Sequence, residues 1–362
     1  MLIPSVPAWV NGKQIAKTRK HDKIIKNLQQ QRGYKMGNAP INEVINQTFR
    51  DTVENWKKEG LSDEIIIEKI NKINFEEVML SMADTASSNY ATFFREKMYE
   101  IELEERAKKQ EFLAHQEQLW GKCFAASQTM YTITVEAAEN ITKYVGENAS
   151  SEEKEARKFT FLALQHIHGR ACQMFLEILT LLRNGFGDCA YARWRSLYEL
   201  NCTAYFIKAQ GEQIAKQYYE QSQSDTAEKD NYAWTTGAIN KKGKPITVKA
   251  FATIETYCEM GKIWNSQYKL ACLVTHGSPE GTFKRMSTYK TQNLIPIGHS
   301  DYGIAVPAEH SAISLHLIST LFFTLFPYVD GIAYVKTLGK WVEVIQDMYY
   351  STENEIFPKA LP

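Results

Sequence analysis

The stretch LLRNGFGDCAYARWRSLYELNCTAYFIKA, residues 181–209, determines the fold that we expect. Its first residues end an apolar run, and Arg183-Asn184-Gly185 is typical of a helix that stops at a glycine. Asp188 can then cap a second helix. That helix carries Arg195 and Glu199 one turn apart among apolar neighbours. The stretch therefore predicts two helices joined by a glycine-containing turn, with a charged pair on the second.

Helical spacing of apolar residues continues on both sides of this hairpin and predicts an all-α protein. A short hairpin signal, Asn11-Gly12, lies within residues 1–15. The polar stretch 147–155 predicts a boundary between an extended helical N-terminal region, 1–146, and a helical bundle, 155–345. The expected helices are 41–59, 65–73, 87–119, 120–146, 156–182, 188–209, 249–260, 262–275 and a last one opened by Pro307.

The composition bounds the class of protein. Hydrophobic residues make up 44% of the 362-residue chain, which excludes wholesale disorder. Lys plus Arg equals Asp plus Glu, at 42 each, so no global field steers the chain towards nucleic acid or anionic lipid. The six cysteines are scattered singly, and residues 1–20 lack the pattern of a secretory signal. We therefore expect a cytoplasmic protein with reduced thiols.

A local basic stretch interrupts this balance. Lys13 to Lys35 contains eight Lys or Arg residues and one acid, Asp22. It is a candidate arm for RNA phosphates, and its substrate-binding candidates are Lys17, Arg19 and Lys20. A solvated first helix explains the same charges, because no aromatic platform for base stacking is interleaved with them.

Two later segments could contact a partner protein or a membrane. Phe93, Met98, Ile101 and Phe112 form a narrow apolar stripe within 87–119, which is typical of contact with one partner helix and indicates a homo-oligomer.

The second segment is 311–329, which contains no Asp, Glu, Lys or Arg over 19 residues, close to the length of a membrane span. His316 and several Ser and Thr residues inside it favour instead a core helix kinked by Pro327, so we do not expect membrane insertion.

The charged pair of the hairpin has two interpretations. Arg195 and Glu199 could form a structural ion pair that fixes helix packing. Alternatively, Arg195 stabilises an anion and Glu199 orients a histidine. His276, at the end of a helix and the start of the irregular segment 276–305, suits a general base near neutral pH, although a histidine there can also cap carbonyls.

Further basic residues lie on the helix that precedes the turn. His166 and Arg170 share a face and, with Arg183, are substrate-binding candidates. His166 and His168 point about 200° apart, which is a poor arrangement for one metal. The chain also lacks the P-loop, GxGxxG, HExxH and GxSxG motifs. No metal or cofactor is expected.

The run from Arg195 to Glu199 (RSLYE), followed by a helix with Tyr268, Cys272 and His276, resembles a bacterial family known only as domain of unknown function 5677. The resemblance covers about residues 155–335. Members of this family look like companions of bacterial anti-phage and mobile-element loci, so the resemblance implies a role in defence and a partner protein from the same locus.

The family also looks similar to the HEPN helical ribonucleases, which use an arginine followed after four to six residues by a histidine. No such spacing occurs in this chain, so an activity of this type requires Arg195 and His276 to converge from different helices. We expect a defence-associated, metal-independent endoribonuclease with His276, Arg195 and Glu199 as catalytic residues. The alternatives are a non-enzymatic helical sensor or partner-binding module and an effector that acts on membranes through 311–329.

Overall fold

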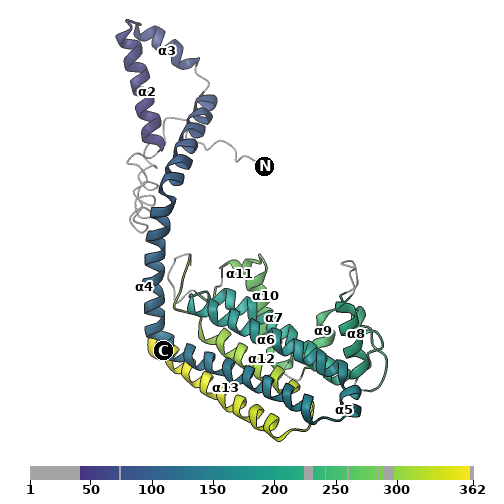
Figure 1. The fold of residues 1–362 in the computed structure, drawn as a ribbon. Helices are drawn as coiled ribbons and strands as arrows, with labels where there is room; N and C mark the ends of the chain where they lie inside the picture. Colours follow the sequence, from purple (N-terminus) through teal and green to yellow (C-terminus); the bar gives the residue numbers. More distant parts are fainter. Residues whose placement is uncertain are drawn as a thin grey trace. The chain divides into compact units, whose positions relative to one another are not determined.

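The computed structural model describes residues 41–72, 75–223, 231–240, 242–258, 261–283, 285–287 and 297–358. Within these ranges the chain forms twelve α-helices and one short 3-10 helix, with no strand, which confirms the all-α class (Figure 1). The expected hairpin of residues 1–15 and the basic arm with Lys17, Arg19 and Lys20 lie outside the described residues.

The chain divides into two compact units, Met1–Glu104 and Glu105–Pro362. The first unit contains α2 (Ile41–Lys58), α3 (Asp63–Asn71) and the beginning of α4. Gly60, with a φ of 83°, follows α2 where the sequence predicts the helix to stop. Ser62 then caps α3 by accepting a hydrogen bond from the Ile65 amide.

Helix α4 (Phe75–Asn148) is one continuous element, so the prediction of two helices meeting at residues 119–120 is wrong. Gly121 costs a helix only about 1 kcal/mol relative to alanine, and this is too little to break it between side chains that are fully buried. Trp120 and Phe124, on either side of that glycine, are both 0% exposed. Their packing keeps the helix intact through the glycine.

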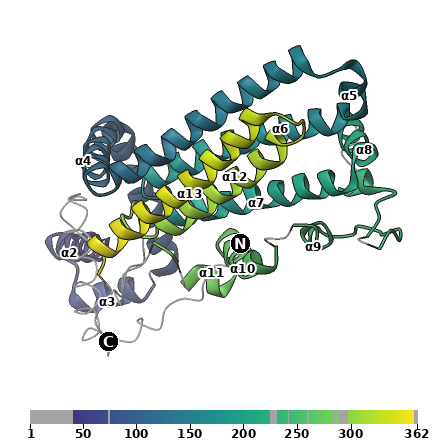
Figure 2. The ribbon, with the colours of Figure 1, turned by 90° about the horizontal axis from the view of Figure 1, so that it is seen from below.

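The second unit is a bundle around α6 (Lys158–Arg183), α7 (Gly187–Gln210) and α12 (Ala305–Phe323), with α13 (Val329–Ile356) packed on α12. Figure 2 shows these four helices alongside one another and α10 (Gly261–Thr275) beyond α7. The smaller elements are α5 (Ser151–Ala156), α8 (Glu212–Ser222), the 3-10 helix Ala233–Thr235, α9 (Phe251–Glu255) and α11 (Pro279–Phe283).

The boundary between the units differs from the expected linker at 147–155. Residues 105–148 of α4 contribute Trp120, Phe124 and Met130 to the same apolar core as α6, α7, α12 and α13. The polar stretch itself forms α5, because Ser150 and Glu153 make a reciprocal capping box at its start.

The sequence predicts one helix over 311–329 that is kinked at Pro327, but the structure has no single helix there. α12 ends at Phe323, and Pro327 lies in the short connection to α13, since proline cannot continue a helix. Most of α12 is buried, including Leu315, Ile318 and Phe322, which explains its lack of charge. No helix in the described ranges is both long and apolar enough to cross a membrane.

The start of α6 is capped from a distance. No side chain at its own N-cap, Arg157, caps the helix. Instead the Glu212 carboxylate of α8 accepts hydrogen bonds from the amides of Phe159 (2.5 Å) and Thr160 (3.0 Å) and from the Thr160 hydroxyl (2.7 Å). This carboxylate thus satisfies amides that would otherwise lack partners in the first turn of α6.

Candidate functional site

The turn between α6 and α7 forms as the sequence predicts, but Asp188 has a different role. The first turn of α7 has no side-chain cap. The Asp188 carboxylate instead accepts hydrogen bonds from the Met286 amide (2.8 Å) and from the Ser287 amide and hydroxyl. The predicted cap is therefore wrong, because the segment after α11 supplies three hydrogen-bond donors to this carboxylate.

Helices α7 and α10 pack against each other and bring together residues that are far apart in sequence. Tyr191 of α7 donates a hydrogen bond to the Gln267 carbonyl of α10 (2.9 Å). Two turns further along α7, the Tyr198 ring contacts the Trp264 ring of α10. The seam between these two helices carries the charged pair that the sequence singles out.

Arg195 and Glu199 form an ion pair at the surface of this seam. Arg195 Nη2 lies 3.0 Å from Glu199 Oε1, and the two side chains are 24% and 33% exposed. The Tyr268 hydroxyl donates a 2.7 Å hydrogen bond to the same carboxylate oxygen. The Arg195 guanidinium also lies 5.6 Å from the centre of the Tyr268 ring. Tyr268 and Glu199 therefore hold the arginine in one orientation.

The electrostatics of this cluster keep Arg195 as a cation and Tyr268 as a neutral phenol. Burial disfavours the Arg195 cation, but the Tyr268 hydroxyl and the Glu199 carboxylate outweigh this and raise the arginine pKa. Burial raises the pKa of Tyr268, and its hydrogen bond to Glu199 raises it further. Arg195 Nε is buried and has no hydrogen-bond partner among the described residues, so this cation keeps an unused donor.

His276 lies directly after α10 and does not contact the pair. Its side chain is exposed, and among the described residues no hydrogen bond or ion pair joins it to Arg195 or Glu199. Tyr268, Cys272 and His276 follow at intervals of four, which places the histidine about 6 Å along the helix axis beyond Cys272. The Cys272 thiol is close enough to influence the pKa of Arg195. His276 thus lies two helical turns, about 12 Å along the helix axis, beyond Tyr268 of the cluster.

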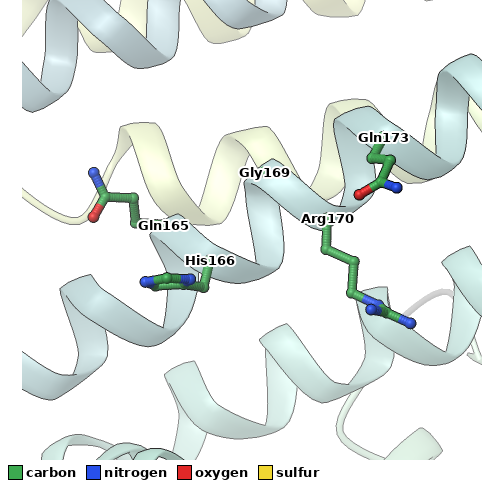
Figure 3. Close-up of a pocket in the computed structure, with 5 residues that line it drawn as sticks. All are labelled: Gln165, His166, Gly169, Arg170 and Gln173. Carbon is green, nitrogen blue, oxygen red and sulfur yellow. The ribbon is translucent and has the colours of Figure 1, made fainter.

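His166 and Arg170 lie on the exposed side of α6, where an open cavity of about 490 Å³ is lined by Gln165, His166, Gly169, Arg170 and Gln173. Figure 3 shows the His166 and Arg170 side chains pointing to the same side of the helix. The Arg193–Glu177 ion pair joins α7 to α6 beside this region. Both predicted substrate-binding residues are therefore accessible to a ligand.

Arg183 occupies a less accessible position. Its guanidinium lies 5.8 Å from the centre of the Phe124 ring, and its Nε is buried without a hydrogen-bond partner among the described residues. His299 stacks on Phe112 and pairs with the Asn184 carbonyl (2.7 Å), so it supports the α6–α7 turn. His310 is buried among aromatic rings that include Trp194 and Trp264.

The sequence alone predicts no function for Tyr268 in the site. Its signal was the four-residue spacing Tyr268, Cys272, His276, which places three polarisable side chains towards one side of α10. The described residues contain no group of three or more His, Cys, Asp or Glu side chains that could hold a metal ion. The seam offers a fixed cation, a carboxylate, a phenol and a nearby imidazole.

The fold and the seam define a helical bundle with a polar cluster on the surface between two packed helices. Residues 161–293, which include the whole cluster, match the model of a family described as a family of unknown function (DUF5677). No curated protein and no solved structure gives a significant match to the chain. The similarity to HEPN ribonucleases is not shown by these comparisons.

Proposed function

We propose that the protein is a metal-independent endoribonuclease whose active site is the seam between α7 and α10. The observation that carries the proposal is the placement of Arg195, which the Glu199 carboxylate and the Tyr268 hydroxyl hold at the surface, with His276 two turns beyond Tyr268 at the end of α10. A fixed guanidinium and an exposed imidazole are the two groups that intramolecular cleavage of RNA requires.

In this mechanism His276 removes the proton from a ribose 2′-hydroxyl, and the 2′-oxygen forms a bond to the adjacent phosphorus. The bond from phosphorus to the 5′-oxygen breaks, and that oxygen takes a proton from solvent. Arg195 stabilises the negative charge on the phosphorane, while Glu199 and Tyr268 act as positioning residues. The phosphodiester bridges His276 and Arg195. The products are a 2′,3′-cyclic phosphate and a 5′-hydroxyl.

The accessible His166 and Arg170 of α6 are proposed to bind neighbouring phosphates, with the basic arm and Arg183 as further contacts. A role in defence, with a partner protein from the same locus, rests on the family resemblance alone.

The test compares His276→Ala and Arg195→Ala with His115→Ala, which changes another exposed histidine outside the seam. We expect the first two variants to lose at least about 100-fold in cleavage rate, with circular dichroism melting curves like that of the unchanged chain. The cleavage should persist in EDTA and should leave cyclic phosphate ends. A folded His276→Ala protein that cleaves RNA as fast as the unchanged chain refutes the proposal.

A non-enzymatic module that binds RNA or a partner is the second candidate. It is favoured by the lack of contact between His276 and the pair, since the arginine is already engaged by Glu199. In that case the chain binds single-stranded RNA without cleaving it, and Arg195→Ala weakens binding whereas His276→Ala does not.

A further inference from the structure

The part of α4 that belongs to the first unit has an exposed apolar stripe. Ala91, Phe94, Met98 and Ile101 repeat at intervals of three, four and three residues, the spacing of the core positions of a coiled coil. Phe94 is 43% exposed and Met98 is 50% exposed. From Ala91 to Glu104 only Lys97 and Ile101 are even partly covered. The described residues thus leave this face of the helix without a cover.

The charges beside the stripe are complementary to those of a second copy of the same helix. Arg95 and Lys97 flank its first half, and Glu102 and Glu104 flank its second half at the corresponding heptad positions. When two copies of this helix pair antiparallel with Met98 packed against Ile101 of the second copy, Arg95 faces Glu102 and Lys97 faces Glu104. The twofold symmetry repeats both contacts, so all four flanking pairs have opposite charges.

Other pairings of the same helix bring like charges together. A shift of one heptad in the antiparallel arrangement that packs Phe94 against Met98 places Arg95 opposite Arg95 and Lys97 opposite Lys97. A parallel pairing also brings Lys97 beside Glu102, but it places Glu105 against Glu105 and Lys108 against Lys108, whereas the antiparallel register places Glu105 opposite Phe94 and Lys108 opposite Ala91. The existing Lys97–Glu100 ion pair within one helix (2.8 Å) is exposed and does not compete strongly. The like-charge contacts of the alternatives therefore favour the antiparallel orientation and this register.

We propose that Ala91–Lys108 of α4 forms an antiparallel two-helix coiled coil with the same segment of a second copy of this chain. The proposal is independent of RNA cleavage, because it involves none of the residues of the seam. In solution the full chain then has twice the 41.5 kDa mass of one copy.

The first experiment measures the mass of the full chain by sedimentation at micromolar concentrations. Met98→Lys with Ile101→Lys should convert the dimer to a monomer. Tyr99→Lys with Leu103→Lys is the matched control, since these side chains are exposed (73% and 62%) but lie off the stripe. A monomeric unchanged chain overturns the proposal, and so does a dimer that survives the first pair of substitutions.

The second experiment exchanges the charges. Arg95→Glu with Lys97→Glu should give a monomer, and so should Glu102→Lys with Glu104→Lys, because each places like charges opposite one another. Mixing the two variants restores all four opposite-charge pairs and should give a heterodimer. Failure of the mixture to dimerise contradicts the proposed pairing.

The third experiment tests orientation by disulfide cross-linking in a Cys189→Ser background, which removes the exposed native thiol. In the proposed dimer the two Ala91 positions lie about 25 Å apart along the helix axis, too far for a disulfide. Ala91→Cys alone should therefore not cross-link, whereas its mixture with Lys108→Cys should. Efficient cross-linking of Ala91→Cys to itself indicates a parallel pair and overturns the antiparallel arrangement.

Discussion

At the scale of single residues, His168 shows how this bundle keeps a histidine neutral. Its ring packs against Phe322 and Phe323, and Nε2 lies 3.2 Å from the Ser319 hydroxyl. Burial lowers its pKa to about 4 from the usual 6.5. The native state therefore binds no proton here at pH 5, whereas the unfolded chain does.

This difference predicts a loss of stability in mild acid. The folded pKa is lower than the unfolded one, so stability is fully present above about pH 6.5 and falls as the pH drops towards about 4. Between pH 7.5 and pH 5, His168 should cost about 2 kcal/mol of the free energy of unfolding. His310, whose pKa burial also lowers to about 4, should add a loss of the same sign.

Urea denaturation at the two pH values measures the effect. His168→Gln should lose less stability between pH 7.5 and pH 5 than the unchanged chain, by about 2 kcal/mol. His115→Gln, at an exposed position, should keep the full loss. An unchanged pH dependence in His168→Gln would contradict the assignment.

The sequence predicts local pairs of residues better than distant ones. The four-residue spacing of Arg195 and Glu199 on one helix predicts their contact, and the ion pair is present. The hydrogen bond from Tyr268 to Glu199 depends on the packing of α10 against α7, which no local periodicity encodes. For the same reason the distance from His276 to Arg195 could not be predicted. Its catalytic role stays a prediction.

At the scale of elements, the α6–α7 turn depends on glycine. Gly185 has a φ of 72°, a conformation that favours glycine. A Cβ atom there would lie 2.5 Å from Phe112 Cζ and 2.7 Å from the Ser300 carbonyl oxygen. At Gly187 it would lie 2.4 Å from the Gly303 carbonyl oxygen. The two glycines allow residues 300–303 to approach the turn closely.

Gly185→Ala should therefore lower the free energy of unfolding by about 3 kcal/mol, from the unfavourable φ and the displaced backbone. Gly146→Ala is the matched control, since a Cβ atom there meets nothing within 4 Å inside α4. It should instead stabilise the chain by about 0.5–1 kcal/mol. Chemical denaturation of both variants measures the difference, and equal effects of the two substitutions would refute the role of the close approach.

Prediction of the elements succeeded where periodicity and stop signals agree, as for α6 and α10. It failed where burial overrides a local signal. The sequence predicts separate helices at 87–119 and 120–146, but the buried Trp120 and Phe124 keep α4 continuous through Gly121. Likewise, the uncharged run 311–329 does not show that α12 ends at Phe323.

At the scale of the whole molecule, the bundle requires the second half of α4. Trp120, Phe124 and Met130 are all 0% exposed and belong to the same core as the helices that follow. The composition of residues 147–155 does not show that α4 belongs to this core, because such contacts join residues that are more than 150 positions apart. The Trp120 indole, for example, donates a 3.1 Å hydrogen bond to the Asp301 carbonyl.

Two fragments distinguish a folding unit that begins at residue 105 from one that begins at residue 155. A fragment of residues 105–362 should fold alone with one cooperative thermal transition, since it contains the complete unit. A fragment of residues 155–345 should not, because loss of one large buried side chain already costs about 3–5 kcal/mol against a typical total of about 5–15 kcal/mol. Circular dichroism melting of both compares them. Cooperative folding of the shorter fragment would place the boundary at the polar stretch instead.

The cap that Glu212 places on α6 has a consequence for the order of folding. The first turn of α6 cannot be completed from local sequence, because its amides depend on a carboxylate more than 50 residues later in the chain. That turn therefore orders only after α8 has docked. In the native protein, hydrogen exchange at the Phe159 and Thr160 amides follows the transient detachment of α8 rather than fraying of α6 itself.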